Sequence, residues 1–302
     1  MAKTPERRGP LSILAHDPQG RSLGLDLPPG GVIRRPGRRR WGKAPEALVW
    51  VSDDAVGMGA LAAHRGPQLA AAGLQAVLLQ DHRGLERWWR EREFAPERMS
   101  DPGDHRVGPV LRELWSRVVP DPEEGDEGEE VIAPFGRDWP GLAVAGPADG
   151  PELPGPDAAD GPELPGPDAA DPEAAACELA DELIGRGWLP APRLALVPSR
   201  RGADVPTALG WCGPTNYEND TALISVVLRS WEDRFGARLV ALGFDELHLS
   251  VAAPPPTTAL ALPVAAEHFA VSPDTIRQGS GSIRAYAEEA VTGSGHWSFR
   301  WD

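Results

Sequence analysis

The most regular pattern of apolar and polar positions lies in the last third of the chain, from Arg193 to Asp302. Short β-prone runs bounded by turn residues predict strands. Four segments have this character: RLALVP at 193–198, RLVALG at 238–243, ELHLSVA at 246–252 and HWSFRWD at 296–302. A turn at 243–245 predicts a hairpin between the second and third of them. The last segment places Trp297, Phe299 and Trp301 on one face of its strand.

Helical periodicity interrupts these strands. After a capping residue at 219 or 220, one apolar side chain recurs at every fourth position up to Phe235, which predicts an amphipathic helix. Its stripe consists of Leu223, Val227, Trp231 and Phe235. Another helix is predicted after Asp171, where Pro172 occupies the first turn. Two shorter helices are expected, one that begins near Pro263 and one at about 282–290.

The upstream half contains a second set of elements. EALVWVS at 46–52 and LQAVLLQ at 74–80 predict strands, and the Ala-rich segment between them predicts a helical region, so the order is β-α-β. HRVGPVLRELWSRVV at 105–119 predicts a helix with one apolar face. The acidic run at 121–130 that follows predicts a solvated break in the pattern.

These elements predict an α+β fold in separate parts. Residues 1–45 are rich in Arg, Gly and Pro and predict a flexible basic arm. Residues 46–145 predict a smaller N-terminal α/β domain, and 171–302 predict a C-terminal domain with helices packed on a mixed or mostly antiparallel sheet. Between them, 146–170 predicts a linker, because it contains two identical copies of the Pro- and Gly-rich sequence DGPELPGPDAA.

Composition narrows the class of protein. The chain has 45 acidic against 30 basic residues, which favours solubility and disfavours a general affinity for nucleic acid or anionic membranes. Its two cysteines, Cys177 and Cys212, form no disulfide framework and no CxxC motif, so we expect reduced thiols in a cytoplasmic protein. Neither an export signal nor a run of about 18 apolar residues is present in the sequence. We predict no cofactor and no metal site.

One predicted strand carries an acid and a base on the same face. In ELHLSV, the alternate residues Glu246, His248 and Ser250 point to one side of the sheet. A Glu and a His on one face suit general acid–base catalysis, with Asp233 or Asp245 as a further acid. The alternative, which we favour, is the solvated face of an antiparallel strand. The catalytic hypothesis requires a cleft over this face.

Two other segments have a binding interpretation. Trp297 and Trp301 are candidates for an aromatic platform that stacks on bases or sugars, although packing against Trp231 and Phe235 is the interpretation that we favour. The sequence RRPGRRRWGK at 34–43 combines clustered Arg with one aromatic ring, as nucleic-acid contacts do. Because the rest of the chain is acidic, we favour a solvated arm there and do not expect nucleic-acid binding.

Three blocks of the C-terminal region resemble the family catalogued as domain of unknown function 4253. These are GWCGPTNYENDTALISVVLRSWEDRFGARLVALGFDELHLSVAAPP at 210–255, VAAEHFAVSPDTI at 264–276, and SIRAYAEEAV at 282–291 with the Trp-containing terminus. A more limited resemblance covers ALVWVSDD and APFGRDWPGLA upstream. Pro263 departs from the helix-forming residue usual in the family, and Ser272 stands where many members have Cys. The resemblance therefore implies no catalytic thiol at Ser272.

These observations favour a binding protein over an enzyme. The leading hypothesis is a cytoplasmic protein that binds another protein in an accessory, regulatory or toxin-neutralising role. One alternative is a hydrolase-type enzyme that uses Glu246 and His248. A second alternative is contact with nucleic acid through the arginine-rich arm. We expect no membrane association, and the sequence leaves open whether a small-molecule ligand binds.

Overall fold

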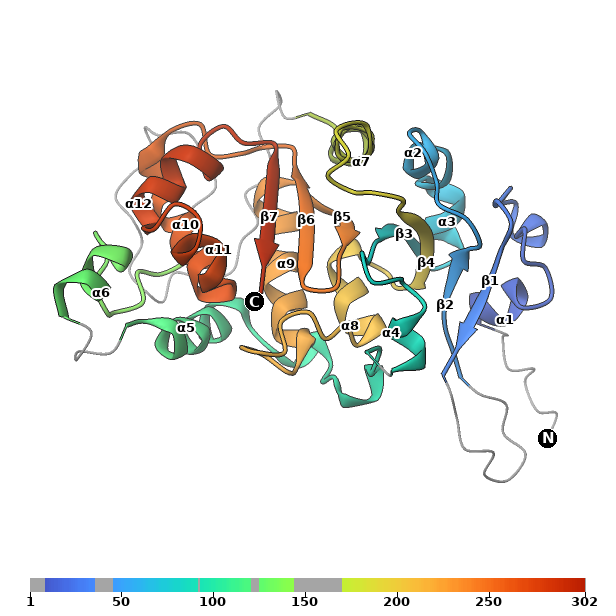
Figure 1. The fold of residues 1–302 in the computed structure, drawn as a ribbon, viewed down its shortest axis with the longest axis horizontal. Helices are drawn as coiled ribbons and strands as arrows, with labels where there is room; N and C mark the ends of the chain where they lie inside the picture. Colours follow the sequence, from blue (N-terminus) through green and yellow to red (C-terminus); the bar gives the residue numbers. More distant parts are fainter. Residues whose placement is uncertain (1–8, 36–45, 92, 121–124, 144–169, 302) are drawn as a thin grey trace.

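A seven-stranded sheet runs through the computed structural model, which describes residues 9–35, 46–91, 93–120, 125–143 and 170–301 (Figure 1). The strands are β1 (Gly30–Arg34), β2 (Ala47–Ser52), β3 (Leu74–Leu79), β4 (Arg193–Pro198), β5 (Ala237–Leu242), β6 (Glu246–Val251) and β7 (His296–Arg300).

Most of the remaining described residues form helices. The α-helices are α1 (Pro10–Leu14), α2 (Ala60–His64), α3 (Pro67–Ala71), α4 (Arg87–Arg90), α5 (Val107–Val118), α6 (Gly125–Ile132), α7 (Pro172–Gly185), α8 (Val205–Leu209), α9 (Thr221–Phe235), α10 (Thr258–Val271), α11 (Pro273–Arg277) and α12 (Ile283–Tyr286). Single turns of 3₁₀-helix are η1 (Arg21–Leu23), η2 (Pro96–Arg98), η3 (Pro102–Asp104) and η5 (Gly202–Asp204), and η6 (Ala287–Val291) is a π-helix. Within the described ranges, none of these helices is both long and apolar enough to cross a membrane.

The strands lie in the order β1-β2-β4-β3-β5-β6-β7. Strand β4 is antiparallel to both of its neighbours, so that Leu196 lies opposite Trp50 of β2 and Ala76 of β3. Strands β3 and β5 are parallel, and the other neighbours are antiparallel. The sheet is therefore mixed, and the α+β class predicted from the sequence is confirmed.

The two segments that we expected to form separate domains contribute strands to one shared sheet. Strands β2 and β3 belong to the segment 46–145, and β4 belongs to the segment 171–302, yet β4 lies between them. The sequence pattern could not reveal this insertion, because a strand's pattern reports its burial and not its neighbours. The repeat-containing linker falls almost wholly at 144–169, outside the described residues.

Both faces of the sheet are buried against helices. In β4, Leu194 and Leu196 belong to one part of the hydrophobic core, and Ala195 and Val197 belong to the other. The first part contains apolar side chains from α1, α2, α3 and α7, and the second contains apolar side chains from α5, α8, α9 and α10. Because successive side chains of a strand point to opposite faces, this division identifies a helical layer on each side of the sheet.

The described part of the predicted flexible arm is ordered, which corrects that prediction for residues 9–35. This segment forms α1, η1 and β1, and Leu11 is buried in the core. Gly30 permits close packing of β1, since a Cβ atom there would lie 2.3 Å from the ring of Trp50. The apolar residues that anchor the segment are scattered among Gly, Pro and charged residues, so its composition concealed the strand. The arginine-rich run at 34–43 lies mostly outside the described residues.

The strongest helical patterns are confirmed. In α9, the Asp220 side chain accepts a hydrogen bond from the Ala222 backbone at 3.0 Å, and Gly236 ends the helix with a φ of 60°. In α7, Asp171 caps the first turn and Pro172 follows it, as predicted. The apolar stripe of α5 is buried, and it consists of Val110, Leu111, Leu114, Trp115 and Val118.

Two helices differ from their predictions. The acidic run expected to be a solvated break includes α6, because Ile132 at its end is fully buried and anchors an amphipathic turn. Helix α10 begins at Thr258, several residues before the predicted start at Pro263. The Thr257 side chain caps this earlier turn, and Pro263 lies inside the helix.

A buried carboxylate joins three parts of the second helical layer. Glu267 of α10 is 0 % exposed and accepts hydrogen bonds from Arg234 at 2.6 and 2.9 Å and from the Trp231 indole at 2.7 Å. It also accepts from the backbone N–H of Ala143 at 2.8 Å. The ion pair therefore connects α10 and α9 to the segment that precedes the linker.

We expect Glu267→Gln to lower the free energy of unfolding by about 3–5 kcal/mol, because the substitution leaves the guanidinium of Arg234 buried without a counter-charge. Urea denaturation of the full chain measures this change. The control is Glu182→Gln, which breaks the exposed pair of Glu182 with Arg186 and should cost less than about 1 kcal/mol. Equal losses in the two variants would contradict the structural role of the buried pair.

Candidate functional site

The polar row predicted on β6 is present, but α7 covers much of it. His248 pairs in register with Ala241 of β5, and Ala241 belongs to the part of the core beneath α7. His248 is 9 % exposed and Ser250 is 0 % exposed, whereas Glu246 at the start of the strand remains partly exposed. The prediction of a solvated strand face is therefore wrong for His248 and Ser250, because α7 packs against β5 and β6.

A cavity of about 290 Å³ opens beside the exposed end of this row. We call it the histidine cavity, and β6, β7 and α11 supply its main polar residues, which are Glu246, His248, Asp274, Thr275, Ser298 and Arg300. The cleft that the catalytic hypothesis required is thus present next to Glu246 and His248. Its lining combines carboxylates, hydroxyls, an imidazole and a guanidinium, a set that suits a small polar ligand.

The edge of the cavity is held in place by hydrogen bonds between α11 and β7. The Ser272 hydroxyl donates to the backbone carbonyl of Arg300 at 2.7 Å, and the Arg300 N–H donates to the Thr275 hydroxyl at 2.9 Å. The Tyr217 hydroxyl donates to Asp274 Oδ1 at 2.7 Å. Because β7 is the last strand of the sheet, these contacts satisfy part of its outer edge and fix the cavity lining.

His248 is in contact with a second imidazole. Its Nδ1 lies 3.2 Å from Nε2 of His296 on β7, and its Nε2 lies 3.9 Å from Oε2 of Glu246, too far for a hydrogen bond. Burial, with a smaller effect from a charge on His296, lowers the pKa of His248 to about 4. Burial also lowers the pKa of His296. At neutral pH His248 is therefore uncharged and can accept a proton.

The two further acids suggested for catalysis lie elsewhere. Asp233 of α9 forms an ion pair with Arg201 at 2.6 Å, near the beginning of β5. Glu246 lies near the opposite end of β5, since Leu242 pairs with Leu247. Asp245 is in the turn before β6, where its backbone carbonyl accepts from Trp301, and its side chain does not line the cavity. The structure therefore brings together Glu246 and His248 without Asp233.

The aromatic residues of the last strand are in the core. Trp297 and Trp301 are each 1 % exposed, which excludes them as an open platform and corrects their candidacy as binding residues. Trp297 contacts the rings of Trp231 and Phe235, the packing that the sequence pattern favoured. Ser250 is also fully buried, and its hydroxyl has no hydrogen-bond partner among the described residues.

The cavity residues that sequence reasoning missed come mainly from α11. Asp274 and Thr275 follow Pro273 in a short segment that carries no catalytic motif and no long periodic pattern. Arg300 and Ser298 occupy alternate positions of the last strand, opposite its aromatic face. That alternation was the available signal, because it places Ser298 and Arg300 on the same face of the strand. The register of β6 and β7 then puts Arg300 opposite Glu246.

A second exposed feature lies on the loop before α2 and just after the end of α7, and Figure 1 shows where these two helices lie. Met58 and Trp188 are 64 % and 55 % exposed, unusual for large apolar side chains. A Cβ atom on Gly185 of α7 would lie 3.7 Å from the sulfur of Met58, so Met58 rests against the helix end that leads to Trp188. The Val56 N–H donates to the carbonyl of Pro192 at 2.7 Å and keeps the two loops side by side.

The two segments that carry these side chains also carry exposed acids. Asp53 and Asp54 are exposed in the loop before Met58, and Glu182 is exposed on α7. Arg186 pairs with Glu182 at 2.9 Å and lies 4.8 Å from the ring centre of Trp188. We call the two exposed apolar side chains together with these charged residues the Trp188 surface. It consists of Met58, Trp188, Asp53, Asp54, Glu182 and Arg186.

No cluster of three or more potential metal ligands occurs among the described residues. The cysteines do not supply an activated nucleophile at neutral pH. Burial and a hydrogen bond to Glu93 raise the pKa of the Cys212 thiol to about 12, and burial raises the pKa of Cys177. Neither cysteine lines the histidine cavity, whose polar lining consists of hydroxyl, carboxylate, imidazole, amide and guanidinium groups.

Comparison with protein families supports the resemblance seen in the sequence. Residues 193–302 match the family model described as Domain of unknown function (DUF4253). The match covers every residue that lines the histidine cavity. It begins after Met58 and Trp188, and it does not include the upstream segments that also resembled the family. The comparisons with curated proteins and with solved structures return no match.

The position of His248 predicts a pH-dependent stability. The unfolded chain takes up its proton near the ordinary pKa of 6.5, whereas the folded chain does so near pH 4. The free energy of unfolding should therefore fall as pH drops from 6.5 towards 4, by up to about 3 kcal/mol from this residue. His248→Gln should give a shallower slope in urea denaturation over this range.

The matched control for this experiment is His82→Gln at a position where the imidazole is 70 % exposed. We expect this variant to keep the slope of the unchanged chain. A His248→Gln variant with the same pH dependence as the unchanged chain would contradict the low pKa of His248.

Proposed function

We propose that this chain, whose residues 193–302 match a family of unknown function, is a cytoplasmic protein that acts by binding another protein through the Trp188 surface. The observation that carries the proposal is the exposure of Trp188 and of Met58, which lies against the last residue of α7. Trp, Met and Arg are enriched in the centres of protein interfaces, and this surface contains all three types. An accessory or regulatory role fits such a protein, and toxin neutralisation is one form of it.

The charged residues of the surface indicate the chemistry of the partner. Asp53 and Asp54 are exposed in the loop that carries Met58, Glu182 is exposed on α7, and Arg186 is already paired with Glu182. A basic segment with an apolar side chain complements this arrangement, because its cations face the carboxylates while the side chain covers Trp188. A second copy of the chain is disfavoured, since it would bring two sets of exposed acids together.

We expect Trp188→Ala to weaken binding of such a partner by about 30-fold or more, as truncation of a central interface Trp does. The full chain with an affinity tag is used to recover the partner from its own cells, and the dissociation constant of the purified pair is then measured. Because the surface carries these charges, we also expect the association rate to fall as salt concentration rises.

Leu142→Ala is the matched control, because Leu142 is the other large apolar side chain that is exposed among the described residues. This variant should bind as the unchanged chain does. A partner that binds Trp188→Ala and Leu142→Ala with equal affinity would refute the assignment of the Trp188 surface. Self-association that disappears in Trp188→Ala would assign the surface to a second copy instead.

A second candidate function is a hydrolase-type enzyme that acts in the histidine cavity. The specific observation in its favour is that Glu246 and His248 line one cavity of about 290 Å³ together with Ser298. In this role uncharged His248 accepts a proton from water or from a hydroxyl, and Glu246 binds or orients the substrate. The register places Ser298 directly opposite His248 on the neighbouring strand.

We expect His248→Gln and Glu246→Gln each to abolish hydrolysis of model ester and phosphoester substrates if the cavity is catalytic. The substrates are assayed with the full chain, and small-molecule thermal shifts are recorded in parallel. His105→Gln is the control because His105 does not line the cavity. If neither cavity variant changes any activity or any ligand-induced shift, the enzyme hypothesis is wrong.

A further inference from the structure

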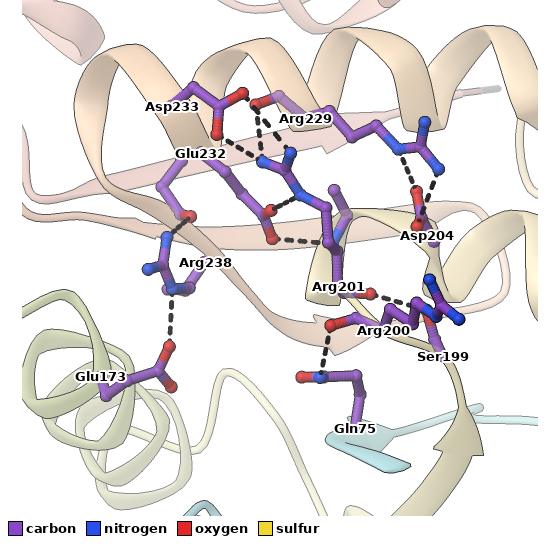
Figure 2. Close-up of polar contacts among 12 residues, drawn as sticks. Gln75, Glu173, Ser199, Arg200, Arg201, Asp204, Arg229, Glu232, Asp233 and Arg238 are labelled. Atoms are coloured by element: carbon purple, nitrogen blue, oxygen red, sulfur yellow. Dashed lines mark hydrogen bonds and ion pairs between the residues drawn. The ribbon is translucent and has the colours of Figure 1, made fainter. Parts of the chain in front are cut away.

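An arginine-rich cavity lies near the beginning of β5, whereas the histidine cavity lies near the end of that strand. Its volume is about 280 Å³. The lining comes from both halves of the sequence. It contains four arginines, one of them Arg65 in the upstream half, and three acids, and it consists of Arg65, Gln75, Glu173, Arg200, Arg201, Gly202, Glu232, Asp233 and Arg238. Figure 2 shows how the downstream arginines are arranged among the acids of α7 and α9.

One of these arginines is fully matched by acids. Arg201 forms ion pairs with Glu232 at 2.8 Å and Asp233 at 2.6 Å (Figure 2). It also donates to the backbone carbonyl of Arg229 at 3.1 Å. These contacts hold the loop after β4 against α9, and they explain Arg201 as a structural residue.

Two other arginines share a single carboxylate. Glu173, in the first turn of α7, accepts Arg65 on one oxygen at 2.7 Å and Arg238 on the other at 2.6 Å. The Arg65 side chain is 7 % exposed, and burial lowers its pKa. A lowered pKa means that the ion pairs of Arg65 do not fully offset the loss of its hydration. At Glu173, two guanidinium groups therefore meet one carboxylate.

Arg200 adds a further cation at the same cavity. Its backbone carbonyl accepts a hydrogen bond from the Gln75 side chain at 3.3 Å, which fixes the position of the residue. Among the described contacts, its guanidinium forms no ion pair, and it is exposed. The Nη2 atoms of Arg65 and Arg238 likewise have no hydrogen-bond acceptor within the part of the chain that the structure describes.

We propose that this cavity binds a small oxyanion of the phosphate class, held by Arg65, Arg200 and Arg238. Guanidinium groups present several N–H donors in a plane and bind phosphate oxygens by charge-assisted hydrogen bonds. The bound anion adds negative charge beside Arg65 and Arg238, which share Glu173, and beside Arg200. The cavity lies at the first turn of α7 and the Trp188 surface lies beyond its last turn, so the two sites are separate.

The test is titration of the full chain with inorganic phosphate at constant ionic strength. Binding is measured by calorimetry, and stabilisation is measured by the shift in melting temperature. We expect saturable binding and stabilisation that the same ionic strength of chloride does not produce. Arg200→Gln should weaken phosphate binding by about tenfold, because it removes charge-assisted donors without breaking an ion pair of the described fold.

Arg112→Gln is the matched control, since Arg112 is an exposed arginine on α5, away from the cavity. It should bind phosphate as the unchanged chain does. No stabilisation beyond that of chloride would overturn the proposal and leave the arginines a purely structural role. An equal loss of affinity in Arg200→Gln and Arg112→Gln would also overturn it, because the effect would then report net charge.

A phosphomonoester distinguishes the source of the anion. The cavity is larger than a phosphate ion, so glycerol 3-phosphate is titrated beside inorganic phosphate. Tighter binding of the ester, sensitive to Arg200→Gln, assigns the cavity to a phosphorylated molecule. Equal binding of the two with the same sensitivity assigns it to the free ion.

Discussion

The structure depends most on the insertion of β4 between β2 and β3. Each edge of β4 forms backbone hydrogen bonds with a strand from the other half of the sequence, and its two faces contribute to both parts of the core. Unpaired strand edges and half-exposed cores are unfavourable, so neither half is complete without the other. The Glu267–Arg234 ion pair adds a second connection, because the same carboxylate binds the backbone of Ala143 before the linker.

The segment that matches the family model contains both buried networks and accessible sites. Several residues of the segment that matches the family model are internal: Trp231 and Glu267 form one buried network, and His268 is enclosed by aromatic rings. The accessible polar and apolar features lie around that core. Two of them combine both halves, since Met58 adjoins the end of α7 and Arg65 shares Glu173 with Arg238.

Much of the secondary structure could be predicted from the sequence, since it rests on local signals. The caps of α7 and α9, the stripe of α5 and the alternation of β7 each involve residues close together in the chain. The order of the strands could not, because β4 pairs with residues more than 100 positions away. The candidate site was predicted in part: Glu246 and His248 share a face as expected, but Asp274 entered through the packing of α11 on β7. Ser250 is buried because α7 packs on β5 and β6, and no local pattern in the sequence reveals which strands a helix covers.

Calorimetric unfolding of the full chain tests the central claim, that the two halves form one cooperative unit built on β4. The account predicts a single transition in which the calorimetric enthalpy equals the van't Hoff enthalpy. Two resolved transitions would contradict it, above all if residues 171–302 alone reproduced one of them. In that case the shared sheet would not be what holds together the Trp188 surface and the arginine-rich cavity, each of which is formed by both halves.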